Sequence, residues 1–209
     1  MKIKICGIRT IESAKVAVEA GADFIGFNFV PSSGRKIKPS LAVEILKQLP
    51  ENLSTKIVGI FKDQTINDIK KIIATVPLDY VQLHGKETPE FCASLKFPII
   101  KTFNLEANFD PEYVIFIMRK YSFVDLFLLD RAIQGQGDKL NLSSIIRLSK
   151  DTRFLLAGGI SLDNIKEYEN IPKLYGVDVA GGVETHGQLD TIKIRKLLLS
   201  KRSDGNIKL

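Results

Sequence analysis

Short runs of apolar, strand-forming residues recur along the whole chain, and segments with helical spacing separate them. The eight runs predicted as strands span residues 2–6, 23–29, 56–61, 80–84, 98–103, 126–130, 154–158 and 176–180. Between them, apolar positions with a helical repeat predict helices at 11–22, 41–48, 66–74, 90–95, 112–121, 142–149, 164–170 and 192–199. Strands that alternate with helices are typical of a parallel sheet built from βα units.

The number of these units favours one fold. Eight βα units in 209 residues predict a (β/α)8 TIM barrel, an α/β fold in which parallel strands close into a cylinder inside a ring of helices. An open, doubly wound sheet is the alternative. No linker-like stretch or break in composition divides the chain, so we expect a single domain over residues 1–209.

Composition excludes several classes of protein and raises a question about charge. Apolar residues make up 44% and charged residues 26%, which excludes a disordered chain and a collagen-like repeat. The net charge of +6 is compatible with binding either nucleic acid or a small anion. Because the lysines are spread along many predicted helices and no nucleic-acid-binding motif occurs, we expect no nucleic-acid partner.

The two cysteines, Cys6 and Cys92, form neither a disulfide framework nor a metal-ligand motif. We therefore expect that the protein binds no metal and that it works in a reducing cytoplasm. Lysines interrupt the first apolar run, unlike a signal peptide, and no run approaches the ~20 apolar residues of a membrane-spanning helix. A cytoplasmic protein without a membrane partner is predicted.

Polar residues and glycines gather at the ends of the predicted strands. In barrels of this kind the active site forms at the C-terminal ends of the strands. Six such ends carry unusual residues here, namely Cys6-Gly7, Asn28-Phe29, Gln82 to Gly85, Asp130-Arg131, Gly158-Gly159 and Gly181-Gly182. We therefore predict an active site at this face.

The alternation of side chains along a strand predicts a buried lysine beneath this face. If Cys6 points into the barrel, Lys4 points inward one layer below it, and Asp178 points inward below Ala180. The first and last strands are neighbours in a closed barrel, so we predict a Lys4–Asp178 ion pair, because a buried ammonium needs a partner. Lys4 would then favour the Cys6 thiolate. Alternatively, Lys4 faces a helix and reaches solvent.

Glycine pairs at the ends of the last two strands predict a phosphate site. Gly158, Gly159, Gly181 and Gly182 would let backbone amides approach an anion closely. Barrels often bind phosphate in the loops after these two strands. Tight turns without a ligand are the alternative interpretation.

Six segments together resemble one family. Residues 4–8 (KICGI), 26–29 (GFNF) with 33–35 (SGR), 81–85 (VQLHG), 128–130 (LLD), 156–160 (LAGGI) and 176–185 resemble phosphoribosylanthranilate isomerases of tryptophan biosynthesis. The resemblance runs from Lys4 to about Asp190. It implies a barrel, a phosphorylated small-molecule substrate and an Amadori rearrangement. In this reaction the aminoaldose N-(5′-phosphoribosyl)anthranilate becomes 1-(o-carboxyphenylamino)-1-deoxyribulose 5-phosphate, without a cofactor.

The resemblance also implies roles for individual residues. Cys6 is the base that removes the C2′ proton, Asp130 is the acid that protonates the ring oxygen, and Arg35 meets the anthranilate carboxylate. Gln82 and His84 line the pocket. A free thiol has a pKa near ~8.5, so Cys6 needs help from nearby charge, while Asp130 needs a raised pKa to hold its proton.

The chain departs from the family pattern at the end of the last predicted strand. Ala180 and Gly181 stand where many members have serines, so hydroxyl contacts to phosphate are lost. Gly135 and Gly137 resemble a family loop that we expect to cover the site.

The alternative enzyme is the imidazole-carboxamide isomerase of histidine synthesis, which uses two aspartates, whereas the first strand here ends in Cys6. The oligomeric state is expected to be a monomer or a homodimer.

Overall fold

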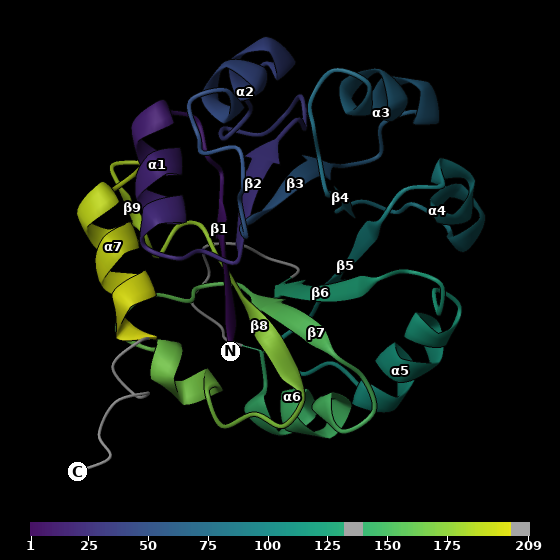
Figure 1. Cartoon of the computed structure of the whole chain (residues 1–209). Helices are drawn as coiled ribbons and strands as arrows, with labels where there is room; N and C mark the ends of the chain where they lie inside the picture. Colours follow the sequence, from purple (N-terminus) through teal and green to yellow (C-terminus); the bar gives the residue numbers. More distant parts are fainter. Residues whose placement is uncertain (132–139, 202–209) are drawn as a thin grey trace.

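Eight parallel strands close into a barrel in the computed structural model, which describes residues 1–131 and 140–201. The strands pair in chain order, and β8 pairs with β1 to complete the ring. Figure 1 shows the strands at the centre and the helices around them. The (β/α)8 barrel is therefore confirmed, and the open doubly wound sheet is excluded.

The strands agree with the predicted apolar runs to within two residues at each end. They are β1 (Lys2–Cys6), β2 (Phe24–Asn28), β3 (Lys56–Phe61), β4 (Tyr80–Leu83), β5 (Ile99–Leu105), β6 (Leu126–Arg131), β7 (Phe154–Ala157) and β8 (Leu174–Val179). Two ends differ by two residues, because β8 begins before the predicted start at Gly176 and β5 continues past the predicted end at Phe103. As a result, Asn104 belongs to this strand.

Helices surround the strands at the predicted places. They are α1 (Ile11–Glu19), α2 (Pro39–Leu46), α3 (Ile66–Ile73), α4 (Pro89–Leu95), α5 (Pro111–Arg119), α6 (Leu142–Ser149) and α7 (Thr191–Ser200). A 3-10 turn (Ile165–Tyr168) replaces the helix expected at 164–170. After β8 the chain forms a small hairpin, β9 (Glu184–Thr185) and β10 (Gln188–Leu189), before α7.

Local sequence explains where several helices begin. The side chain of Thr65 caps α3 and that of Asn141 caps α6, and both residue types are favoured at this position. Helix α2 begins at Pro39, with Lys38 at the N-cap position. Proline suits a first helical position, since its missing N–H would have no partner there.

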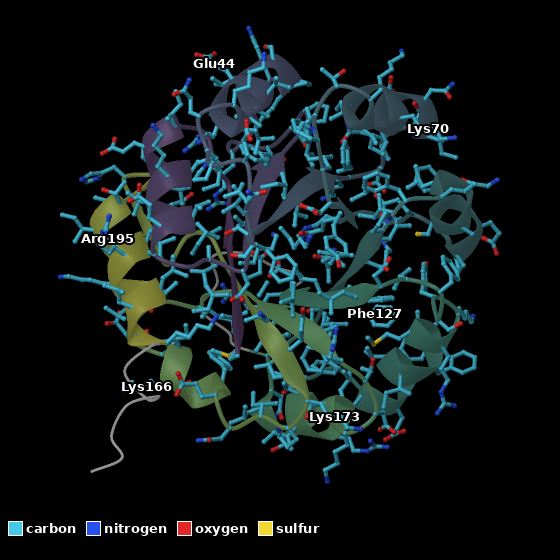
Figure 2. The ribbon with its side chains drawn as sticks, in the orientation of Figure 1. Glu44, Lys70, Phe127, Lys166, Lys173 and Arg195 are labelled. Atoms are coloured by element: carbon cyan, nitrogen blue, oxygen red, sulfur yellow. The ribbon has the colours of Figure 1, made fainter. Side chains whose placement is uncertain are left out.

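Apolar side chains fill the barrel and the space around it. A cluster that includes Phe24, Val58 and Leu128 fills the interior of the barrel. A larger cluster packs between the strands and the helices. In Figure 2, Phe127 lies between β6 and α5, whereas Lys70 lies at the periphery. None of the helices in residues 1–131 and 140–201 is long and apolar enough to cross a membrane.

Candidate active site

A cavity of about 680 Å³ opens at the C-terminal ends of the strands. This volume lies in the range of metabolite-binding pockets. The residues to which the sequence assigned a role in catalysis or binding all line it: Cys6, Arg35, Gln82, His84, Asp130, Gly158, Gly159, Gly181 and Gly182. The barrel therefore brings these residues together, and their individual roles remain predictions.

The predicted ion pair lies beneath this cavity. Lys4 is completely buried, and its Nζ donates to Oδ1 of Asp178 at 2.9 Å. The two residues are direct neighbours in the register of β1 and β8. The alternative, a lysine that reaches solvent past a helix, is wrong. Removing one partner from such a buried pair costs ~3–5 kcal/mol, because it leaves the other charge uncompensated.

The Cys6 thiol packs beside Lys4 in space that Gly26 leaves open. A Cβ on Gly26 would lie 3.3 Å from Cys6 Sγ and 3.3 Å from Lys4 Cε. Burial raises the pKa of the Cys6 thiol to about 11, although the charges of Lys4 and Arg35 lower it. Lys4 thus acts in the expected direction, because its charge and hydrogen bond lower the pKa of Cys6, but it does not set the outcome. Desolvation of the anion outweighs the attraction of the ammonium.

Asp130 ends the inward-facing row of β6 and is 5% exposed. Burial raises the pKa of its carboxyl, which is the direction expected for a general acid. The charges of His84 and Arg131 oppose this rise, as does the backbone N–H of Arg131, which donates to Oδ1 at 2.8 Å. The same N–H is placed to stabilise the carboxylate once it has lost its proton.

His84 lies beside Asp130. Burial lowers the pKa of the imidazole, although nearby carboxylates raise it. Its Nδ1 is 3.4 Å from Nε2 of Gln82. Its Nε2 is 3.2 Å from Oδ1 of Asn104 and 3.5 Å from Oδ2 of Asp130.

Arg35 lies at the rim of the cavity, where a carboxylate orients it. Its Nε and Nη2 donate to the two carboxylate oxygens of Glu184 at 2.6 and 2.7 Å. This contact occupies one edge of the guanidinium. The edge formed by Nη1 and Nη2 is a second place where a planar carboxylate can bind with two hydrogen bonds.

Three of the four glycines at the predicted phosphate site are required by the backbone. Gly158 and Gly159 have φ values of +96° and +73°, and a Cβ on Gly182 would lie 1.9 Å from the carbonyl oxygen of Ile160. At Gly181 a Cβ would have only ordinary contacts, the nearest at 3.8 Å. Turn geometry therefore explains three glycines, and phosphate binding remains a prediction.

Two contributors to the site were missed from the sequence. Asn104 faces the cavity side of β5, and continuing the alternation past Phe103 would have identified it. Glu184 comes from β9 and gives no local signal, because it contacts Arg35 across 149 residues of chain and no short sequence pattern identifies that contact.

Gly135 and Gly137 of the expected covering loop lie outside the described residues. Across 1–131 and 140–201, no group of His, Cys, Asp and Glu is arranged to hold a metal ion.

Comparisons with known proteins agree with one another. The family model described as N-(5′phosphoribosyl)anthranilate (PRA) isomerase matches residues 3–199. An N-(5′-phosphoribosyl)anthranilate isomerase of Pelobacter propionicus is 38% identical over 205 residues, which cover 95% of this chain and 94% of the relative. The crystal structure of the enzyme from Thermus thermophilus has a TM-score of 0.85 and 33% identity, covering 97% and 99% of the two chains.

One solved relative contains a ligand. It is a phosphoribosyl anthranilate isomerase in complex with reduced 1-(o-carboxyphenylamino)-1-deoxyribulose 5-phosphate. Its TM-score is 0.81 at 30% identity, and the alignment covers 99% of this chain and all of the relative.

Proposed function

This chain belongs to the N-(5′-phosphoribosyl)anthranilate isomerase family, and we propose that Cys6 and Asp130 perform its reaction. It is an isomerase of tryptophan biosynthesis, which converts N-(5′-phosphoribosyl)anthranilate into 1-(o-carboxyphenylamino)-1-deoxyribulose 5-phosphate. The family match decides against the imidazole-carboxamide isomerase. One observation carries the assignment of roles: a single cavity holds a thiol from β1 and a buried carboxyl from β6.

Asp130 begins the reaction as the acid. It gives a proton to the ring oxygen of the ribose, the bond from C1′ to that oxygen breaks, and an iminium forms between C1′ and the anthranilate nitrogen. The raised pKa of Asp130 supports this role, because it keeps a larger fraction of the carboxyl protonated. After the transfer, the carboxylate is stabilised by the backbone N–H of Arg131 and faces Nε2 of His84 at 3.5 Å.

Cys6 continues the reaction as the base. Its thiolate takes the C2′ proton, and the electrons of that C–H bond move toward the iminium to give an enolamine. Tautomerisation then shifts a proton from the C2′ hydroxyl to C1′ and leaves the ketone. Because the iminium already acidifies C2′–H, general acid–base catalysis is sufficient in this scheme. The enzyme is reset when Cys6 loses its proton and Asp130 regains one.

The protonation states of the free enzyme limit how much of it is active. With a pKa of about 11, Cys6 is a thiol at neutral pH, whereas the base must be a thiolate. The productive form, which pairs a thiolate with a protonated Asp130, is therefore a minor population. Lys4 and Arg35 increase that population, because both charges lower the pKa of Cys6.

The two ends of the substrate are anionic and require different partners. The Nη1–Nη2 edge of Arg35 suits the anthranilate carboxylate, and its bidentate bond to Glu184 holds the guanidinium in place. The loops after β7 and β8 suit the phosphate, because their glycines leave the backbone open to the cavity. Gln82 and His84 would then line the space beside the sugar.

A direct assay tests this proposal. Phosphoribosylanthranilate is generated from anthranilate, and its fluorescence decay is followed with added protein. The wild type should accelerate the decay, and Asp130→Asn should lose kcat by ~10²–10⁴-fold, the usual contribution of a general acid. Asn104→Ala, which alters a neighbour of His84, should have a much smaller effect. An Asp130→Asn enzyme with normal kcat would refute the assignment of the acid.

The setting of the reaction also belongs to the proposal. We expect a cytoplasmic enzyme that acts on a small phosphorylated substrate as a monomer or homodimer, without a nucleic-acid partner. Analytical ultracentrifugation measures the oligomeric state. Retention on DNA at physiological salt would contradict the last expectation.

A further inference from the structure

The side chain of Arg131 lies across the two glycines that follow β7. A Cβ on Gly158 would be 2.8 Å from Arg131 Nε and 2.9 Å from its Cγ. A Cβ on Gly159 would be 3.1 Å from Nη2 and 3.4 Å from Cζ. The guanidinium therefore occupies the space that side chains at these positions would need. Besides adopting positive φ, the two glycines make room for a cation.

Arg131 is the described cation that lies against the loop after β7. The basic side chains that line the cavity in residues 1–131 and 140–201 are Arg35, Lys62 and Arg131. Arg35 donates to Glu184, and its Nη2 would lie 3.8 Å from a Cβ on Gly181, so it faces the loop after β8, whereas Lys62 follows β3, across the barrel from β7. Arg131 comes from β6, which is hydrogen-bonded to β7, so its guanidinium lies directly beside the loop after β7.

The chemistry of the loop after β8 creates a need for such a cation. Ala180, Gly181 and Gly182 line the cavity there and carry no hydroxyl. Backbone N–H groups can bind phosphate oxygens, but they carry no net charge to balance a dianion. A guanidinium supplies both a full positive charge and several N–H donors in a planar fork that matches phosphate.

We propose that Arg131 binds the phosphate of the substrate and so holds it beside the acid Asp130. This inference rests on the proposed function and adds a residue for which the sequence offered no role. A consequence concerns Asp130, whose pKa the charge of Arg131 lowers. A bound phosphate dianion offsets that charge, so substrate binding favours the protonated acid.

The test compares two inhibitors that probe opposite ends of the cavity. Inhibition constants for inorganic phosphate and for anthranilate are measured with the wild type, Arg131→Met, Arg131→Lys and Lys62→Met, together with KM and kcat. Arg131→Met should weaken inhibition by phosphate by about 10- to 100-fold, the value of a charge-assisted contact. Inhibition by anthranilate should change less than about twofold. Arg131→Lys should restore part of the phosphate effect, and Lys62→Met should leave it unchanged.

Three outcomes would overturn the inference. The first is unchanged inhibition by phosphate in Arg131→Met, and the second is an equal loss for both inhibitors, which indicates a general disturbance of the cavity. The third is the absence of phosphate inhibition in the wild type. A failure of the proposed function looks different, because wild-type protein would then not accelerate the isomerisation, whereas phosphate binding can still be measured by calorimetry.

Gly181→Ser is an independent check. A serine Cβ fits at this position, where the nearest atoms are Arg35 Nη2 at 3.8 Å and Glu184 Oε2 at 4.0 Å, and its hydroxyl adds a donor at the predicted phosphate site. The substitution should strengthen inhibition by phosphate and should partly compensate for Arg131→Met in the double variant. If it has no effect on phosphate in either background, the phosphate does not bind beside Gly181.

Discussion

Two lysines of this barrel are almost completely buried, yet only one of them lies beside a group proposed to react. Lys4 on β1 is 0% exposed and Lys101 on β5 is 2% exposed. Each donates to a carboxylate, Lys4 to Asp178 at 2.9 Å and Lys101 to Glu87 at 2.7 Å. Burial, charge and ion pairing are thus the same in both.

The surroundings of the two pairs differ. Lys101 follows the inward-facing Ile100 on β5, so it points out of the barrel wall, where its Nζ also donates to the carbonyl oxygen of Gly85 at 2.7 Å. Glu87 in turn accepts the backbone N–H groups of Asp63 and Gly85. This pair holds together the segments that follow β3 and β4.

Lys4 faces the inside of the barrel. It contacts Asp178 and the Cys6 thiol, one layer below the cavity. A buried ion pair is therefore no evidence of catalysis by itself, because the face of the strand decides which groups it can influence. A cysteine lies near each pair, Cys6 near Lys4 and Cys92 near Lys101, and burial raises the pKa of both thiols to about 11. This symmetry makes the comparison testable.

Removing each thiol should give the largest difference. Cys6→Ala should lower kcat by ~10²–10⁴-fold, because the base is lost. Cys92→Ala removes a fully buried thiol in α4 and should leave kcat of the folded enzyme unchanged. Steady-state kinetics of both variants measures this. Normal kcat in Cys6→Ala would show that Lys4 supports no more chemistry than Lys101 does.

Removing each ammonium should separate stability from activity. Lys4→Met and Lys101→Met should each lower the free energy of unfolding by ~3–5 kcal/mol, because each leaves a buried carboxylate unpaired. Only Lys4→Met should also lower kcat/KM at neutral pH, by about tenfold for each unit by which the pKa of Cys6 rises. Urea unfolding and kinetics are the measurements.

A matched variant guards against failure to fold. Lys4→Met combined with Asp178→Asn removes both charges of the pair and should recover part of the stability. Equal losses of kcat/KM in Lys4→Met and Lys101→Met would contradict the distinction between the two pairs.

The pH profile of kcat/KM should sharpen the comparison further. Activity needs a protonated Asp130 and a deprotonated Cys6, and the pKa of Asp130 lies below that of Cys6. The rate should therefore rise up to the raised pKa of Asp130, stay level, and fall above about 11, the pKa of Cys6. Lys4→Met should shift the alkaline limb to higher pH and lower the rate at the plateau, whereas Lys101→Met should change neither. An acid limb at the pKa of an ordinary aspartate would contradict the expectation that burial raises the pKa of Asp130.

The smallest effect is expected at Gly26. In Gly26→Ala the new methyl group would lie 3.0 Å from Ile60 Cδ1 and 3.3 Å from both Cys6 Sγ and Lys4 Cε, so these atoms must shift by a few tenths of an ångström. We expect kcat to fall by ~10-fold and stability by ~1–3 kcal/mol, a usual cost of overpacking. Kinetics and thermal unfolding measure the two losses, and a loss of stability with normal kcat would show that Cys6 tolerates displacement.

The inward residues of the site were largely predictable from the chain. The Lys4–Asp178 pair follows from alternation along two strands that must be neighbours once a barrel closes, and the register of β1 and β8 places the two side by side. The same rule puts Cys6, Gln82 and Asp130 at the cavity. Alternation is a property of the extended backbone, so it can be read from a few consecutive residues.

Contacts made outside the strands could not be predicted in this way. The bond between Glu184 and Arg35 joins a hairpin after β8 to a loop after β2. The Lys101–Glu87 pair is closer in sequence, but it depends on how the loop after β4 folds back over β5. Loop conformations depend on packing and hydrogen bonds that no short stretch of sequence specifies.

The sequence by itself determined the order of the strands, the faces of their side chains and the family to which the chain belongs. Only the tertiary structure decided the pKa values of the groups in the site, since burial outweighs Lys4 at Cys6 and lowers the pKa of His84. It also decided which cation lies beside each loop, Arg35 against Glu184 and Arg131 across Gly158. The physical reason is that a strand pattern is local, whereas desolvation and charge depend on distances between residues far apart in the chain.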